Sequence, residues 1–401
     1  MSDRFGRRAV SGVLIHAAAA LALASTLLLS GCHNFFVCQK SSCSSSGGGT
    51  TTGSGNYLYV SNSASSSTSL AGYDISKGAL TAISGSPFPL GYVPVALNIT
   101  PSDSFLYIAT IPGATSPGVY VYSIASNGVL TIGNGGKAVV ADQIASMDIS
   151  PDGNYLFTVS TTGLIMNEYQ INGSTGGLTA VTSLQLPGLT CALTLGTPVT
   201  QSCTVKVSPS GQFVVVSLGT AGDVIFPYTS TSGITSGNYN LIESGTTTAN
   251  PTGDFSVGLT KNNFAYIART STLAAYSIGS TGAPTSLGSI SYASGATPRS
   301  VTLSSGYNYV YTANEGGSTI SEFAIGTSGG LTQLSGSPVA APTNVSALGV
   351  DKTGAYLAAA GYNATSGVQL YTIGSNGALT SAASTGSGTS TAYPAVLVLT
   401  H

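Results

Sequence analysis

A short strand that begins with an aromatic residue recurs seven times along this 401-residue chain. The seven first residues are Tyr57, Phe105, Tyr155, Phe213, Phe264, Tyr309 and Tyr356. They lie 48, 50, 58, 51, 45 and 47 residues apart, which is about the length of a four-stranded propeller blade. Such a repeat buries its apolar faces only by stacking on its neighbours. The sequence therefore predicts an all-β fold, a seven-bladed β-propeller over residues 56–401.

The second strand of each repeat carries an aromatic residue at one fixed register. These residues are Tyr73, Tyr122, Tyr169, Tyr228, Tyr276, Phe323 and Tyr371. In six repeats an Ile follows two places later, on the same face of the strand. We expect this face to pack against the next blade.

The ends of the chain indicate how the ring closes. In a propeller the innermost strand of a blade precedes a turn such as Ser150-Pro151-Asp152-Gly153, and the first aromatic strand has no such strand before it. Residues 394–400 match residues 94–100 in register, and no aromatic strand follows them. The C-terminus is therefore predicted to supply the innermost strand of the first blade, which removes the open edges of the ring. We interpret Asp103 and Asp152 as turn residues without a functional role.

The N-terminus has the pattern of a processing signal. Arg4, Arg7 and Arg8 precede an apolar run over residues 9–29, which ends in Leu-Ser-Gly-Cys at Cys32. This tetrapeptide resembles the bacterial lipobox, so residues 1–31 are predicted to be a lipoprotein signal peptide, and the resemblance implies a lipid on Cys32. A plain secretory signal or a membrane-spanning helix is the alternative.

Residues 32–55 are rich in Ser, Gly and Thr and are predicted to be a flexible tether. His33 rather than Asp follows the cysteine, which resembles the sorting pattern of outer-membrane lipoproteins. We therefore expect a lipid-anchored protein of the cell envelope, held at the outer membrane, on its periplasmic or surface face.

Four further cysteines allow three pairings. Local pairing would join Cys38 to Cys43 and Cys191 to Cys203, and disulfides persist in exported proteins. A zinc site is the alternative, but the spacing does not fit one and the only nearby histidine is His33. We expect no metal.

Only 24 of the 401 residues are charged, and the formal net charge is −2. Because this gives no basic footprint, nucleic acid is excluded as a partner. The sequence contains neither a phosphate loop nor a recognisable serine-nucleophile motif, so we expect no cofactor. We expect a monomer.

The repeats resemble the lactonase family of seven-bladed propellers, which includes 6-phosphogluconolactonase-like proteins. The resemblance rests on the Tyr-x-Tyr-x-x-Asn opening at Tyr57 and Tyr309, the Ser-Pro-Asp-Gly turn and the aromatic-x-Ile strands. It covers residues 56–401. It implies the propeller fold and lactone hydrolysis as an activity.

Two positions match residues that the family uses for chemistry. Family members carry Pro-Arg-His at the start of an innermost strand and Asn-Glu after the aromatic strand that follows. Here Arg299 and Glu315 match, but Ser300 replaces the histidine. The rest of the chain has histidine only at positions 16, 33 and 401, so the usual acid–base group of a hydrolase is missing.

Arg299 and Glu315 are thus the candidate catalytic residues. We expect Arg269 and Asn314, which end aromatic strands, and Gln143 to contribute to ligand binding on the same rim. An arginine–carboxylate pair there could hold a sugar acid, or polarise a lactone carbonyl while Glu315 assists a water. The alternative for this pair is a structural ion pair between blades.

Two functions remain open, together with a weaker third. A binding or scaffold module for a small polar ligand, a glycan or an envelope partner is favoured by the missing histidine and the low charge. A lactone hydrolase is favoured by Arg299 and Glu315. The third is a surface or adhesion protein.

Asp148 and Lys206, at one register of adjacent innermost strands, are expected to form a stabilising pair.

Overall fold

A computed structural model describes residues 55–64, 67–110, 116–161, 163–187, 193–194, 200–201, 203–219, 222–234, 237–242, 254–293, 295–362, 367–385 and 395–401. These residues belong to one compact unit, Thr51–His401. The predicted signal peptide, the tether, Cys32, Cys38, Cys43 and Cys191 lie outside the described residues. Cys203 is buried, and its pairing with Cys191 stays a prediction.

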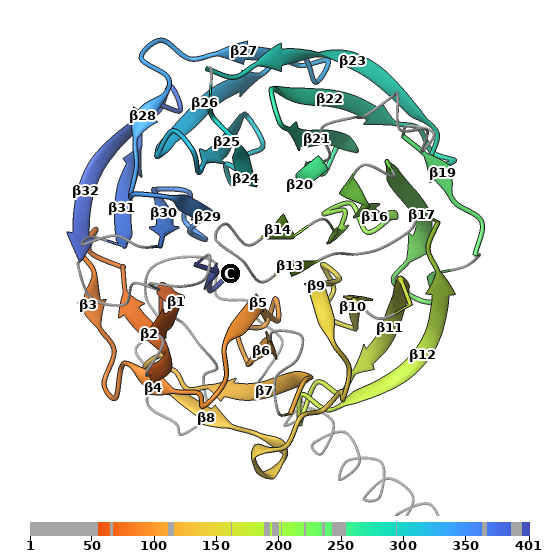
Figure 1. Cartoon of the computed structure of the whole chain (residues 1–401), viewed down its shortest axis with the longest axis vertical. Coiled ribbons are helices and arrows are strands. Elements are labelled where there is room, and N and C mark those ends of the chain that lie inside the picture. The colour runs from red at the N-terminus through yellow and green to blue at the C-terminus, as the bar shows by residue number, and fades with distance from the viewer. Residues whose placement is uncertain are drawn as a thin grey trace, which may run out of the picture. The chain divides into compact units, whose positions relative to one another are not determined.

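Seven antiparallel sheets stand around a central axis, which confirms the predicted propeller (Figure 1). In blades 2 to 7 the chain runs from the innermost strand outward. The strands of the first three blades are β1 (Tyr57–Ala64), β2 (Ser67–Asp74), β3 (Thr81–Ala82) and β4 (Phe88–Pro89); β5 (Pro94–Ile99), β6 (Phe105–Thr110), β7 (Val119–Ile124) and β8 (Leu130–Ile132); β9 (Ile144–Ile149), β10 (Tyr155–Ser160), β11 (Ile165–Ile171) and β12 (Leu178–Gln185). A short 3-10 turn covers Asn134–Gly136.

The second half of the ring repeats this order. Its strands are β15 (Thr204–Val207), β16 (Phe213–Ser217), β17 (Asp223–Thr229), β18 (Gly233–Ile234) and β19 (Asn240–Leu241); β20 (Asp254–Leu259), β21 (Phe264–Arg269), β22 (Thr272–Ile278) and β23 (Pro284–Ser291); β24 (Pro298–Leu303), β25 (Tyr309–Asn314), β26 (Thr319–Ile325), β27 (Leu331–Gln333) and β28 (Val339–Ala340); β29 (Val345–Val350), β30 (Tyr356–Gly361), β31 (Val368–Ile373) and β32 (Leu379–Thr385). Between blades 3 and 4, β13 (Leu193–Thr194) and β14 (Thr200–Gln201) form a separate hairpin, which accounts for the longest interval between repeats.

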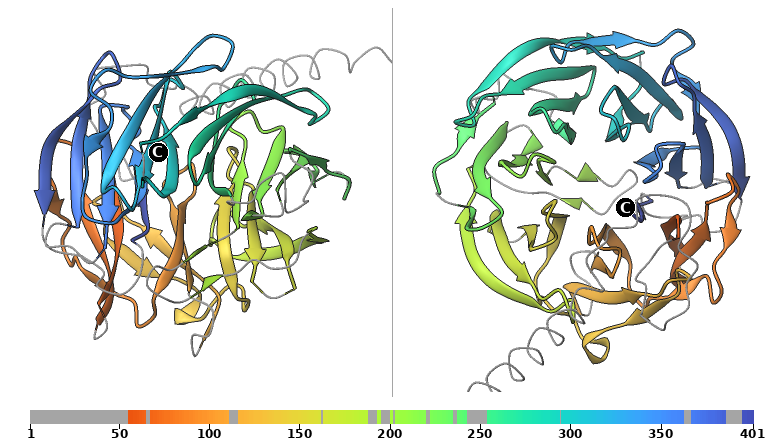
Figure 2. Two further views of the ribbon diagram at one scale, coloured as in Figure 1. Left: turned by 45° about the horizontal axis from the view of Figure 1, so that its top comes forward. Right: turned by 180° about the vertical axis from the view of Figure 1, so that it is seen from behind.

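The C-terminal strand closes the ring, as predicted. β33 (Leu397–Leu399) pairs with β1, so blade 1 is built from both ends of the chain. The C-terminus accordingly lies beside the central axis in the views from either side (Figure 2). The described part of the chain contains no helix long and apolar enough to cross a membrane.

The register aromatic of the second strand packs against the preceding blade, not the next one as predicted. Tyr228 of blade 4 meets Tyr155 and Phe157 of blade 3 edge to face, at 6.1 and 5.5 Å between ring centroids. Contact with the next blade comes instead from the aromatic strand. The hydroxyls of Tyr59, Tyr107, Tyr266 and Tyr311 donate to glycine carbonyls in the hairpin turns of the following blades, at 2.7–3.0 Å.

Side chains of the innermost strands join each of blades 3 to 7 to the next blade around the axis. The hydroxyls of Ser146, Ser256 and Ser300 accept backbone N–H groups of the following blade at 3.1–3.3 Å. Thr204 and Ser346 donate to backbone carbonyls of the following blade. Because each bond satisfies a backbone group inside the ring, a hydroxyl is favoured at these positions.

Candidate functional site

Arg299 stands at a β-bulge on the rim where the innermost strands begin. Pro298 pairs with Asn314 and Ser300 with Ala313, so Arg299 is the extra residue between them. The same bulge occurs at Val95, Phe255 and Ser346 in other blades. A bulge turns its side chain out of the regular alternation of the strand. This geometry places Arg299 on the rim.

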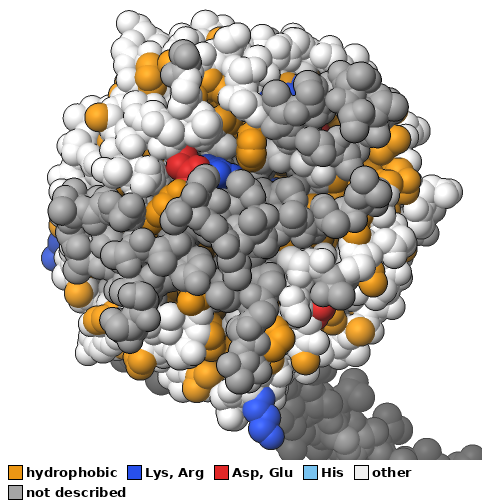
Figure 3. Space-filling model, in the orientation of Figure 1, with side chains coloured by type: hydrophobic (Ala, Val, Ile, Leu, Met, Phe, Trp, Pro, Cys, Tyr) orange, Lys and Arg blue, Asp and Glu red, His pale blue; other side chains and the backbone are white. Residues whose placement is uncertain are grey.

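Arg299 and Glu315 are in direct contact, as the spacing predicted. Arg299 Nε donates to Glu315 Oε2 at 2.5 Å, and the side chains are 13% and 7% exposed. The guanidinium lies over the ring of Phe255 in blade 5, with Cζ 5.4 Å from the ring centroid. Figure 3 shows an acidic and a basic side chain side by side on this face, over the region of β25 and β30.

Tyr362 completes this group, and sequence reasoning missed it. It follows β30 at the position that Glu315 occupies after β25, and its hydroxyl donates a short hydrogen bond to Glu315 Oε1. Burial and then the Glu315 carboxylate raise the pKa of Tyr362, so the phenol stays protonated. The signal that could have found it is the aromatic residue six places after Tyr356, in the slot of Glu315.

Only one edge of the Arg299 guanidinium is engaged. Within the described residues its hydrogen bonds run from Nε alone, and the two terminal Nη groups have no protein acceptor. Glu315 and Phe255 hold the side chain in place. The free Nη edge is a planar pair of donors, the geometry that matches a carboxylate or a phosphate.

Arg269 belongs to a neighbouring ion pair instead. Its Nε donates to Asp254 Oδ1 at 3.1 Å and its Nη2 to the Tyr276 hydroxyl at 3.0 Å. Asp254 is fully buried and directly precedes Phe255. The two arginines therefore lie on the same rim in adjacent blades, each with its own carboxylate.

Asn314 and Gln143 do not join the Arg299 group. Asn314 is fully buried, and its amide donates to Thr319 and Ser321 within blade 6, so it has no surface for a ligand. Gln143 lies before β9 in blade 3, where its carbonyl accepts from the Thr161 backbone.

Ser300, at the position of the family histidine, accepts the Leu348 N–H from blade 7 at 3.3 Å. It therefore supports the interface between blades 6 and 7.

On another part of the ring, Lys206 Nζ lies 3.5 Å from Asp148 Oδ1, which confirms the predicted contact between these two side chains. Asp148 Oδ2 also accepts the Val207 N–H, so this carboxylate is a bridge between blades 3 and 4.

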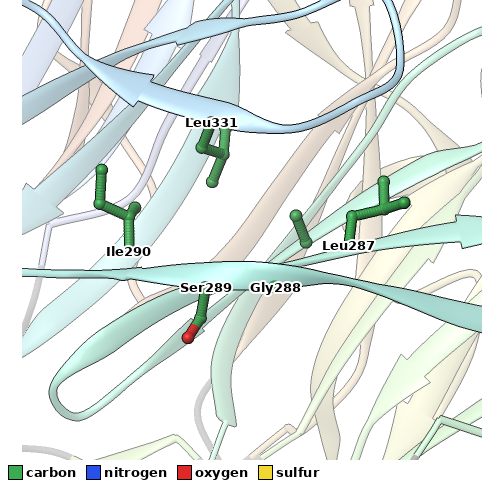
Figure 4. A pocket seen from close by; sticks show the side chains of 6 residues that line it. Leu287, Gly288, Ser289, Ile290 and Leu331 are labelled. Carbon is green, nitrogen blue, oxygen red and sulfur yellow. The ribbon is translucent and has the colours of Figure 1, made fainter.

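A small pocket lies away from this rim, between β23 of blade 5 and β27 of blade 6. It is lined by Leu287, Ile290, Leu331, Ala275 and Gly288, while the hydroxyl of Ser289 points away from it (Figure 4). No charged side chain lines this pocket, so it lacks the converging charged groups expected of a site for an anion. In the described part of the ring no cluster of His, Cys, Asp and Glu could hold a metal ion.

The fold and this rim define the chain as a seven-bladed β-propeller. Residues 270–392 match the model of the family "Lactonase, 7-bladed beta-propeller". This matched part contains Arg299, Glu315 and Tyr362, and over these residues the chain is similar to the lactonase propellers. A search among curated proteins found no match.

Solved structures share the fold at low sequence identity. A protein from Lactobacillus plantarum superposes with a TM-score of 0.66 at 15% identity, covering 86% of this chain and 100% of that chain. A candidate 6-phosphogluconolactonase of Bacteroides fragilis gives 0.65 at 16%, covering 87% and 98%. The periplasmic gluconolactonase of Pseudomonas aeruginosa gives 0.61 at 16%, covering 86% and 99%.

Proposed function

We propose that this propeller is a binding module whose rim holds a small anionic ligand, such as a sugar acid, through the free edge of Arg299. The observation that carries the proposal is the half-engaged guanidinium, which is fixed through Nε and has no acceptor at either Nη group within the described part of the ring. An arginine that is already held in place loses little further side-chain entropy when a ligand binds.

The charge balance of the site limits the affinity. Glu315 already neutralises Arg299, so a bound carboxylate adds one uncompensated negative charge near Glu315. We therefore expect weak to moderate binding, with a Kd of roughly 10 μM to 1 mM.

Lactone hydrolysis is the second candidate. It is supported by the family match over residues 270–392, and two of the solved structures with the same fold are named as gluconolactonases. In this reaction the Nη edge of Arg299 would polarise the lactone carbonyl. Glu315 would assist a water, since each of its oxygens holds one hydrogen bond and can accept another. The described rim offers no histidine to take up the proton.

A lactone panel on the purified protein separates the two candidates, with Arg299→Ala and Glu315→Ala measured alongside. Turnover that either substitution abolishes would establish the hydrolase. Binding of the sugar acids without turnover of any lactone, lost in Arg299→Ala, is the result that we expect.

We also propose that the ring is held at the cell envelope by a lipid on Cys32, through the tether of residues 32–55. This rests on the sequence pattern alone. Metabolic labelling with a palmitate analogue, compared between wild type and Cys32→Ser, tests it. Equal labelling of the two proteins would contradict it.

A further inference from the structure

Blades 4 and 5 meet at two buried aspartates on the same rim. Asp223 opens β17 and Asp254 opens β20, and they are 0% and 1% exposed. Ser217, the strand partner of Asp223, donates its hydroxyl to the Asp254 carbonyl at 3.4 Å. The starts of the two strands therefore lie together across the blade interface.

Among the described residues, Asp254 is paired with a cation and Asp223 is not. Arg269 pairs with Asp254, and its Nη2 bonds Tyr276. Neither Asp223 oxygen accepts a hydrogen bond from a described donor, and the groups that interact with this carboxyl are Asp254, Arg269 and Ser217. If Asp223 were ionised without such a partner, its desolvation alone would cost several kcal/mol of folding free energy.

Burial, and after it the negative charge of Asp254, raises the pKa of Asp223 well above its ordinary range, while Arg269 and Ser217 oppose the rise. With the proton on Asp223, one negative charge on Asp254 balances one positive charge on Arg269. Without it, two adjacent negative charges share a single arginine inside the seam.

We propose that Asp223 holds a proton at neutral pH and donates it to Asp254, so that the two carboxyls form a pH-sensitive latch between blades 4 and 5. The latch adjoins the rim site, because Phe255 follows Asp254 directly in the chain and the Arg299 guanidinium lies over its ring. It stands independently of the ligand proposed above.

The sign of the effect follows from the raised pKa. The folded chain binds the proton more tightly than the unfolded chain, so the stabilisation is complete below the ordinary carboxyl pKa of about 4 and is lost as the pH rises toward the folded-state pKa. The melting temperature of the intact protein should therefore fall with rising pH. Asp223→Asn keeps a donor toward Asp254 without titrating, and it should show a clearly shallower fall.

Asp142→Asn is the matched control, because Asp142 is a partly exposed aspartate on the same rim whose carboxylate accepts donors from Gln143 and Ser160. It should keep the wild-type pH dependence. Equal pH dependence in wild type and Asp223→Asn would overturn the latch.

An infrared measurement decides the matter even if Asp223→Asn fails to fold. Wild type at pH 7 should show the carbonyl band of a protonated carboxyl. Asp254→Asn retains Asp223 but replaces the acceptor of its proton, so the band should shift. A wild-type spectrum without the band, or a band that Asp254→Asn leaves in place, would overturn the proposal.

Discussion

The backbone amide of Tyr57 donates a hydrogen bond to Thr400 Oγ1, 343 residues further along the chain, at 2.9 Å. In every other blade, the backbone amide of the first residue of the aromatic strand donates to the side chain of a turn residue four or five places earlier. These acceptors are Thr100, Ser150, Ser208, Thr260, Ser304 and Asp351. Thr400 thus takes in blade 1 the role that a preceding turn takes elsewhere.

Removal of residues 395–401 should destabilise the whole ring. Blade 1 would lose its innermost strand and the buried Leu399, and Asp103 would lose the His401 N–H that it accepts at 2.7 Å. Burial of one such leucine is worth about 2–5 kcal/mol, so a fall of many degrees in melting temperature is expected. Thr400→Val, which removes only the hydroxyl, should cost about 1 kcal/mol. A truncated protein that melts at the wild-type temperature would show that β33 does not close the ring.

Loss of a tyrosine hydroxyl that bonds to the next blade should cost more unfolding free energy where that hydrogen bond is buried than where it is exposed. Tyr311→Phe leaves the buried Gly377 carbonyl without its donor and should cost about 1–3 kcal/mol in the free energy of unfolding. Tyr309→Phe is the matched control, two residues away, because its hydroxyl bonds the Ser375 carbonyl in an exposed position. Denaturant unfolding should rank them in this order, and equal costs would refute the role of burial.

Tyr362→Phe should weaken ligand binding without unfolding the ring. Glu315 loses one of its two donors, so it holds Arg299 less firmly, and the affinity should fall about five- to tenfold. Titration of a sugar acid measures this. Tyr307→Phe, on the opposite rim, should leave the affinity unchanged; a loss of equal size there would point to a general disturbance of the fold.

Two buried glutamates should add to the pH dependence of stability. Glu168 and Glu322 occupy equivalent positions in blades 3 and 6 and accept backbone N–H groups of the next blade, from Ile234 and Leu379. Burial raises the pKa of both, although those N–H groups oppose the rise. Their raised pKa makes the folded state the tighter proton binder, so stability should decline as the pH rises above about 4.

Urea unfolding at pH 5 and pH 8 tests this contribution. Glu168→Gln should reduce the difference in unfolding free energy between the two pH values. A difference that Glu168→Gln leaves unchanged would mean that this carboxyl does not bind a proton preferentially in the folded state.

The ring and its closure could be predicted from the sequence because both follow from repeated local patterns. The aromatic register and the match of residues 394–400 to residues 94–100 each report a strand position directly. It also placed Arg299 beside Glu315, since the beginning of an innermost strand and the end of the next strand share a rim.

Contacts between blades were harder to predict, because they depend on the angle between sheets and not on period or spacing. The direction in which Tyr228 packs, the contact of Tyr362 with Glu315 and the meeting of Asp223 with Asp254 are of this kind. The β-bulge at Arg299 is another, because an extra residue in one strand leaves no clear mark in its own sequence.

Calorimetric titration of the intact protein with gluconate, beside the uncharged polyol of the same carbon skeleton, tests the central claim most directly. Wild type should bind the acid and not the polyol, and Arg299→Lys, which keeps the charge but loses the planar pair of Nη donors, should lose at least tenfold in affinity for the acid. Equal binding of acid and polyol, or unchanged binding of the acid by Arg299→Lys, would contradict the assignment of the Arg299 edge as the ligand site.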